Sequence, residues 1–417
     1  MFTDRSIKET ILSLGLENFL RILLGAAASI LVGRHLGPAD YGKFSYTLSV
    51  VLIFSPLLNF SMNEVIVKTL VDGGYAEREV FTSGLRLRFL LGLIGILCCL
   101  GYAFLGDQSH IAFFPIALYC LFFFLKSFDI VEYFFIAKQR VAEVSKVRSL
   151  IFIGINILKF LLVYLKEDWL WFIYVSCAEL AFVFLLYVIK GSNESWFSFN
   201  LKTEKGLTYR LFKKSFPFFL ITLLMVLFTR ADHLMIWEFL DKAKLGEYSV
   251  VVKWGEFLNF VPLLLTSTFL PKIIEESKNG ATSTSLKLFF RLIFCASLLI
   301  TLFFNLVGPT FIGSLYGGSY VEAPQLIRLY SFQICISFFF AGLVRYLLVV
   351  DRMISAIALY GLALFLNLGI NFFFIPWLGL QGAIYASIVA YLGSLVLGLV
   401  KDSYIRKGAG LYIRSLF

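Results

Sequence analysis

The stretch that decides the fold is residues 11–37, ILSLGLENFLRILLGAAASILVGRHLG. It is mostly apolar and long enough to cross the roughly 30 Å hydrocarbon core of a bilayer as a helix. Two charged residues, Glu17 and Arg21, lie near its middle, where a charge facing lipid costs roughly 2.5–3.5 kcal/mol. A span of this kind needs protein or water around its charged face.

The two charges belong to one polar stripe, because residues four apart share a face of a helix. The stripe comprises Ser13, Glu17, Arg21, Gly25 and Ser29. Two interpretations are open. The stripe lines a water-filled interior, or Glu17 and Arg21 neutralise each other and only fix helix packing.

The composition of the whole chain agrees with a protein built from such helices. Of the 417 residues, 59% are hydrophobic and 15% are charged, whereas a soluble domain carries about 25% charged residues. We therefore predict an all-α polytopic membrane protein with about twelve transmembrane helices, in two six-helix lobes around a central cavity.

The N-terminus shows no small-residue cleavage site, so we expect it to be uncleaved. The net charge of +10 is spread over short loops, which does not favour nucleic acid as a partner.

Apolar runs place the spans in two sets of six. The predicted spans are residues 11–33, 43–67, 84–105, 111–136, 148–165, 169–189, 215–238, 247–270, 287–307, 325–349, 354–375 and 381–400. The predicted parts are an N-terminal lobe at 1–190, a cytoplasmic linker at 191–214, a C-terminal lobe at 215–401 and a cytoplasmic tail at 402–417. Residues 353–400 hold no Asp, Glu, Lys or Arg and one central turn, which predicts a tight helical hairpin.

Lysine and arginine are distributed unevenly over the connections. The set that starts with the N-terminus carries 25 of them and the opposite set carries 5. Basic residues are retained on the cytoplasmic side, so both termini are predicted to be cytoplasmic.

Five cations, Arg21 among them, fall within the predicted spans, and we predict that they line a shared interior that binds an anionic substrate. They are Arg21, Lys126, Lys159, Arg230 and Lys253. Four acids in the spans are candidates for carrying a coupling ion, either a proton or sodium. They are Glu17, Asp129, Glu179 and Glu256. The alternative for each site is an ion pair that only holds helices together, as for Lys126 with Asp129 or Lys253 with Glu256. Arg328 and Arg345 lie near span ends, where their charges can reach the interface, and are left out.

A weak internal repeat relates the two halves. The connector that contains Gly42 and Ser45 matches the connector that contains Gly246 and Ser249, as Gly-x-aromatic-Ser offset by 204 residues. Each is followed by a span with an internal proline, Pro56 or Pro262. Two similar halves around a cationic interior favour an alternating-access transporter. The sequence contains no P-loop and no HExxH motif, so we expect no enzymatic activity, catalytic residue, metal or cofactor.

Three segments resemble the polysaccharide flippases of the Wzx type, which belong to the multidrug/oligosaccharidyl-lipid/polysaccharide exporter superfamily. These segments are LVGRHLGPADYGKFSY at 31–46, LYGGSY at 315–320 followed by APQL at 323–326, and IPWLGLQGA at 375–383. The resemblance implies a two-lobed, twelve-helix fold and the translocation of undecaprenyl-diphosphate-linked oligosaccharide, such as an O-antigen repeat unit for lipopolysaccharide biosynthesis. Its partners would be this lipid-linked substrate, membrane lipids and a polysaccharide polymerase, and its location would be the bacterial inner membrane.

Three alternatives stay open at the level of the sequence. The first two are a multidrug/cation antiporter of the same superfamily and a flippase for the peptidoglycan precursor lipid II. A cavity for organic cations should be dominated by acids, whereas the predicted interior holds five cations, which favours an anionic substrate. A passive scaffold for glycosyltransferases would leave the interior charges unexplained.

Overall fold

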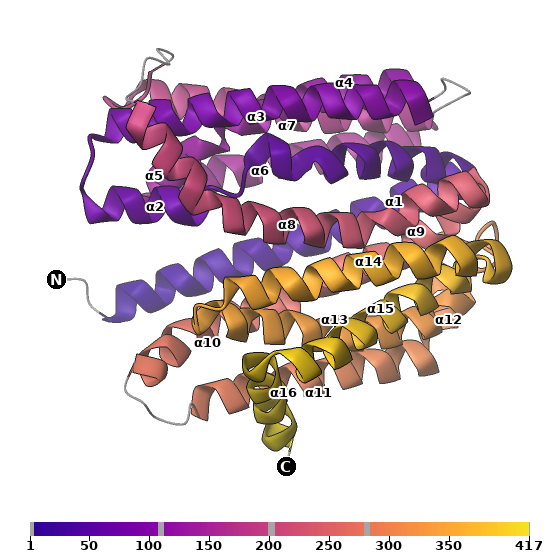
Figure 1. The fold of residues 1–417 in the computed structure, drawn as a ribbon. Helices are drawn as coiled ribbons and strands as arrows, with labels where there is room; N and C mark the ends of the chain where they lie inside the picture. The colour runs from indigo at the N-terminus through magenta and orange to yellow at the C-terminus, as the bar shows by residue number, and fades with distance from the viewer. Residues whose placement is uncertain (1–3, 107–111, 199–204, 279–283, 417) are drawn as a thin grey trace. The chain divides into compact units, whose positions relative to one another are not determined.

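The computed structural model describes residues 4–106, 112–198, 205–278 and 284–416, and the regular structure within these ranges is helical (Figure 1). The side chains of residues 4–22 lie outside the description. Within the described residues, eleven helical stretches are long and apolar enough to span a membrane. The first of these, Leu23–Asp72, is broken at Gly37 and holds two predicted spans. The predicted all-α polytopic class is thus confirmed.

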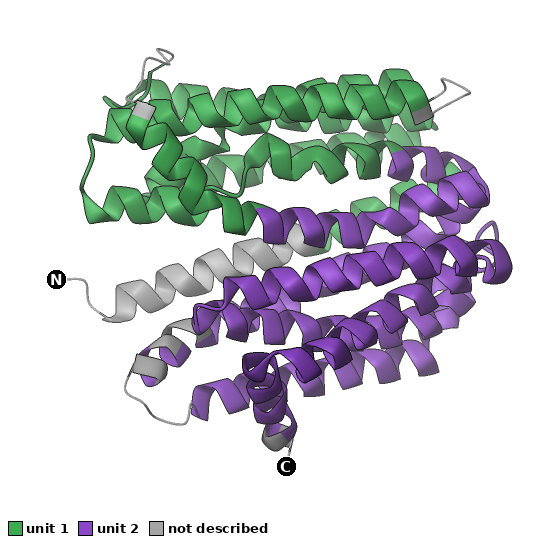
Figure 2. Ribbon diagram, viewed as in Figure 1, with its two compact units in different colours: residues 1–36, 47–219 green, residues 37–46, 220–417 purple. Residues whose placement is uncertain are grey.

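The chain folds into two compact units (Figure 2). Unit 1 comprises residues 1–36 and 47–219, and unit 2 comprises residues 37–46 and 220–417. Two helices run from one unit to the other, α1 (Asp4–Asn59) and α8 (Lys205–Phe239). Helix α1 is interrupted at Gly37, whose backbone has φ 67° and ψ 174°, a conformation that a residue without Cβ adopts readily.

Unit 1 is completed by six α-helices and one 3₁₀ helix. They are α2 (Asn63–Asp72), α3 (Glu77–Gly106), α4 (Phe113–Phe123), η1 (Phe124–Asp129), α5 (Ile130–Ala137), α6 (Ala142–Tyr164) and α7 (Trp169–Ser192). The predicted span 111–136 is therefore not one continuous helix, because η1 interrupts it. The predicted linker at 191–214 is also partly helical, since residues 205–214 form the first turns of α8.

Unit 2 is built from part of α8 and eight further helices. They are α9 (Lys242–Leu258), α10 (Phe260–Lys278), α11 (Thr284–Leu306), α12 (Gly308–Tyr316), α13 (Ala323–Val349), α14 (Met353–Leu378), α15 (Leu380–Lys401) and α16 (Ser403–Leu416). The predicted hairpin is present as α14 and α15, which meet at Gly379 with φ 62°.

The predicted tail at 402–417 forms helix α16, which packs against its own unit. Tyr412 inserts between the rings of Phe290 and Phe339, with centroid distances of 5.1 and 4.4 Å. Asp402 begins the helix by accepting the backbone N–H of Tyr404. Burial opposes ionisation of Asp402, but this bond and one from the Ser355 hydroxyl outweigh it and lower its pKa.

The two connectors of the sequence repeat cross each other within unit 2. A Cβ atom on Gly42 would lie 1.9 Å from the carbonyl oxygen of Lys242, and one on Gly246 would lie 1.9 Å from that of Pro38. Only glycine permits two backbones to approach this closely. Close by, the rings of Tyr46 and Trp237 stack at 4.0 Å. The crossing holds the segment 37–46 in unit 2.

Candidate functional site

Unit 2 brings three of the predicted interior charges together. Arg230 projects from α8, whereas Lys253 and Glu256 are three residues apart on one face of α9. The Nζ of Lys253 lies 2.7 Å from one carboxylate oxygen of Glu256, and the guanidinium of Arg230 pairs with the other oxygen. Since two cations share one carboxylate, this group carries a formal charge of +1 within the candidate spans.

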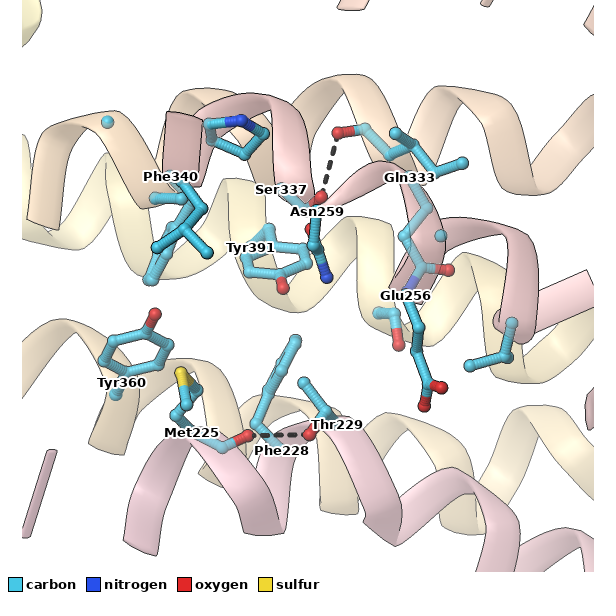
Figure 3. A pocket seen from close by; sticks show the side chains of 18 of the residues that line it. Met225, Phe228, Thr229, Glu256, Asn259, Gln333, Ser337, Phe340, Tyr360 and Tyr391 are labelled. Carbon is cyan, nitrogen blue, oxygen red and sulfur yellow. Dashed lines mark hydrogen bonds between the residues drawn. The ribbon is translucent and has the colours of Figure 1, made fainter. Parts of the chain in front are cut away.

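Two of these charges, Arg230 and Glu256, line a cavity of about 450 Å³ inside unit 2. Its wall is formed by α8, α9, α10, α11, α13, α14 and α15. Figure 3 shows Glu256 toward one end of the cavity, Tyr360 and Phe340 toward the other, and Tyr391 between them. The volume falls in the range of about 300–1,000 Å³ that is typical of ligand sites.

Arg345 also lines this cavity, although its position near a span end had excluded it from the predicted set. Its side chain is exposed and forms no ion pair within the described part of the chain. The sequence could not have selected it, because proximity to a span end does not reveal whether a side chain points to the interface or into the protein.

A second polar cluster in unit 2 surrounds Asp232, which the sequence analysis did not select. Its carboxylate accepts hydrogen bonds from Tyr248 at 2.8 Å, from Asn371 at 2.6 Å and from Ser387 at 3.0 Å. Asp232 is 3% exposed and Asn371 and Ser387 are at most 1% exposed. All three donors are neutral, so no described cation neutralises this acid through an ion pair. The sequence shows which residues are next to Asp232 in the chain, but it does not show that Asn371 and Ser387, far away in the chain, donate hydrogen bonds to it.

One atom of this cluster lacks a partner. The side-chain oxygen of Asn371 is buried and accepts no hydrogen bond from the described residues. It lies on the same amide whose nitrogen donates to Asp232. A buried acceptor without a donor is costly, so the cluster offers an oxygen to a further positive group. Carboxylate, amide and hydroxyl oxygens are the ligand types that hard cations prefer.

Unit 1 holds the other described charges of the predicted set in a looser arrangement. Lys126, Asp129 and Glu179 line a cavity of about 200 Å³ together with Arg148. Glu179 lies 3.9 Å from Lys159, a long ion pair between α7 and α6. Lys126 and Asp129 do not form the local ion pair that was the alternative interpretation. The ammonium of Lys126 instead lies over the ring of Phe123, 5.0 Å from its centroid.

The 3₁₀ helix that carries Lys126 and Asp129 is held by Arg88. The guanidinium of Arg88 is 0% exposed and donates to the carbonyl oxygen of Ser127 at 3.1 Å and to the hydroxyl of Tyr133 at 3.0 Å. Arg88 thus donates a hydrogen bond to a backbone carbonyl group at the point where the α-helix is interrupted. Arg88 lies within helix α3, which begins at Glu77.

The stripe around Glu17 and Arg21 cannot be placed in either cavity, since both side chains lie outside the described residues. The role of this stripe stays a prediction. The described parts of the two units nevertheless define the class of protein: a multi-pass helical membrane protein with charged, cavity-lining side chains inside its spans.

Comparison with known proteins gives the family. A model of the polysaccharide biosynthesis protein family matches residues 7–275, which is more than half of the chain. The chain therefore belongs to the polysaccharide biosynthesis protein family. No curated protein sequence matches it.

Solved structures share its fold over nearly the whole length. Lipid II flippase MurJ in an inward closed conformation is similar with a TM-score of 0.72 and 15% identity, over 97% of this chain and 91% of that chain. An inward-facing multidrug resistance MATE family transporter of the MOP superfamily has a TM-score of 0.70 and 13% identity, over 94% and 95%. A MOP superfamily transporter from Pyrococcus furiosus has a TM-score of 0.60 and 11% identity, over 95% and 93%.

These findings confirm the resemblance to Wzx-type flippases at the level of family and fold. The chain belongs to the polysaccharide biosynthesis protein family and shares the fold of a lipid II flippase and of transporters of the MOP superfamily.

Proposed function

We propose that the protein translocates an undecaprenyl-diphosphate-linked oligosaccharide, the repeat unit of O-antigen or another surface polysaccharide, across the bacterial inner membrane by alternating access. The family supports the polysaccharide assignment. The observation that supports this proposal most directly is the cluster of Arg230, Lys253 and Glu256 in unit 2, called the charge group below, in which the two cations share the single carboxylate of Glu256. The remaining positive charge suits the diphosphate of a lipid carrier.

We propose that the other predicted cations also contact the substrate, and they differ in how available their side chains are. Lys126 is the most available of those in unit 1, because it lines a cavity and forms no ion pair within the described residues. Lys159 is engaged with Glu179 at 3.9 Å and would exchange this partner for phosphate. Arg21 stays a proposal from its sequence position alone. Arg345 joins the set as a cation on the cavity wall of unit 2.

For a coupling ion, proton or sodium, the cluster around Asp232 is a better site than the acids chosen from the sequence. Glu256 and Glu179 already face cations, whereas the hydrogen bonds to Asp232 come from neutral groups. Asp232 would take a proton directly. A sodium ion would be held by Asp232, by the unpartnered oxygen of Asn371 and by the hydroxyl of Ser387.

The topology of the proposal follows the charge asymmetry of 25 to 5 in the sequence. Both termini would lie in the cytoplasm, where the lipid-linked substrate is made, and the head group would be released outside to a polysaccharide polymerase. Rocking between two states about a bound head group requires that the diphosphate contacts differ between these states.

Complementation tests the proposed function against its rivals. The gene is expressed in three strains: one lacking its polysaccharide flippase, one depleted of its peptidoglycan-precursor flippase, and one lacking its drug exporters. We expect restored surface polysaccharide in the first strain only. Rescue of the second strain would assign lipid II as the substrate, and resistance to organic cations in the third would assign a drug antiporter.

A further inference from the structure

We propose that the cavity inside unit 2 binds a sugar ring of the transported head group, and that its polar wall sets which sugars are accepted. This inference rests on the proposed function, which names the lipid-linked oligosaccharide but not where its sugars bind. The cavity measures about 450 Å³ and lies entirely among residues of unit 2.

The first argument is a set of unused hydrogen-bonding groups on the cavity wall. The hydroxyls of Tyr330, Tyr360 and Tyr391 and the amides of Asn259 and Gln333 form no hydrogen bond within the described part of the chain. The side-chain oxygen of Gln333 is fully buried as well. Buried polar groups are normally satisfied, and leaving each one unpaired is costly. The wall therefore favours an occupant that donates and accepts hydrogen bonds.

The second argument is the aromatic character of the same wall. Tyr391 packs between Phe228 and Phe340, with centroid distances of 4.6 and 4.9 Å, and Phe340 also contacts Tyr360 at 5.1 Å. All four residues are at most 8% exposed, so the rings are held by neighbours. Fixed aromatic rings offer flat apolar surfaces beside the hydroxyl and amide groups.

A pyranose ring matches this combination better than the other candidate occupants. Its hydroxyls both donate and accept, as tyrosine hydroxyls and amides do, and its C–H face can lie on an aromatic ring. A lipid chain would leave the polar groups of the wall unsatisfied. The cavity wall carries two cations, Arg230 and Arg345, and two acids, Asp232 and Glu256, so it offers no excess of negative charge to an organic cation.

The position of the cavity relative to the charge group fits the covalent structure of the substrate. Arg230 and Glu256 belong both to the charge group and to the cavity wall. A diphosphate bound by Arg230 would thus place its first sugar next to the tyrosine and amide groups. The two ligand fragments are directly bonded, so their sites must adjoin.

The test compares lipids that differ only in the sugar. The full-length protein is purified, and dissociation constants are measured for undecaprenyl diphosphate and for the same lipid carrying glucose, galactose or N-acetylglucosamine. We expect at least one sugar-bearing lipid to bind about tenfold more tightly than the bare carrier. Tyr391→Phe and Gln333→Met should each reduce that preference about three- to tenfold, the loss expected for one hydrogen bond, while binding of the bare carrier stays the same.

Tyr385→Phe is the matched control, because Tyr385 is 39% exposed on α15 and does not line the cavity. It should leave all affinities unchanged, and unchanged binding of the bare carrier shows that each variant is folded. If no sugar raises the affinity, or if the cavity variants behave like the control, the sugar site is refuted while carrier recognition stands. If the wild-type protein binds none of these lipids, the proposed function fails as well.

Discussion

The hydroxyl oxygens of Ser45 and Ser249 lie 2.7 Å apart, and the two residues are separated by 204 positions in the chain. This separation equals the offset of the sequence repeat, so equivalent residues of the two connectors contact each other. Gly42 and Gly246, which have the same offset, each admit the backbone of the other connector. Such reciprocal contacts are those of an isologous, two-fold arrangement. The weak sequence repeat therefore marks a real structural equivalence.

Gly246→Ala should destabilise the protein, because the new Cβ would lie 1.9 Å from the carbonyl oxygen of Pro38 and the two backbones must separate. We expect a loss of about 1–3 kcal/mol, the usual cost of overpacking, seen as a lower unfolding temperature of the purified protein. Gly154→Ala is the control, since its Cβ would meet no heavy atom within 4 Å. Equal stability of the two variants would contradict the close crossing.

A disulfide should form between cysteines placed at 45 and 249. With Ser45→Cys and Ser249→Cys in a background whose six native cysteines are replaced, mild oxidation should remove both thiols from maleimide labelling, and reduction should restore them. Each single variant should remain labelled after oxidation. Persistent labelling of the double variant would show that these hydroxyls are not neighbours in the membrane.

Glu256→Gln should be more destabilising than Arg230→Gln or Lys253→Gln. Removing the shared carboxylate leaves two cations without their partner, whereas removing either cation leaves one ion pair intact. The difference should be smaller than the roughly 3–5 kcal/mol of a fully buried pair, since all three side chains are partly exposed. Unfolding temperatures of the three variants check the order, and a milder effect of Glu256→Gln would overturn the shared-carboxylate arrangement.

Asp232→Asn should uncouple transport from the ion gradient while the protein still folds. The substitution keeps the shape of the side chain and one oxygen to accept from the Asn371 amide, and its new amide nitrogen can donate to the hydroxyl of Tyr248 or Ser387, but it removes the charge that would hold a proton or sodium ion. In proteoliposomes, wild-type transport should depend on an imposed proton or sodium gradient and the variant should be slower and gradient-independent. Asp241→Asn, at the start of α9, is the control. Retained gradient dependence in Asp232→Asn would place the coupling site elsewhere.

Reporter fusions after Gly191 and at the C-terminus should be active only with a cytoplasmic reporter. The expectation comes from the excess of basic residues in the N-terminal set of connections, 25 against 5. A fusion within residues 166–168, in the opposite set, serves as the control and should be active only with a periplasmic reporter. A periplasmic signal at either of the first two positions would reverse the assigned orientation.

Much of the fold could be predicted because it depends on local composition. Residues 353–400 lack any formal charge, so they had to form two membrane-length helices with a turn between them, and α14 and α15 do so. The broken helix at η1 could not be predicted in this way. The carbonyl of Ser127 within η1 accepts a hydrogen bond from Arg88, 39 residues away, and such a distant contact does not show in local composition.

The sequence by itself determined that the protein is a multi-pass helical membrane protein with an internal repeat and unusual charges in its spans, because hydrophobic length and charge are properties of short segments. Only the tertiary structure decided which charges act together. Asp232 meets Asn371 and Ser387 across 139 and 155 positions, and Arg230 meets Glu256 across 26. Such pairings depend on how helices rotate and pack against each other, and the periodicity of a single helix carries no information on its neighbours.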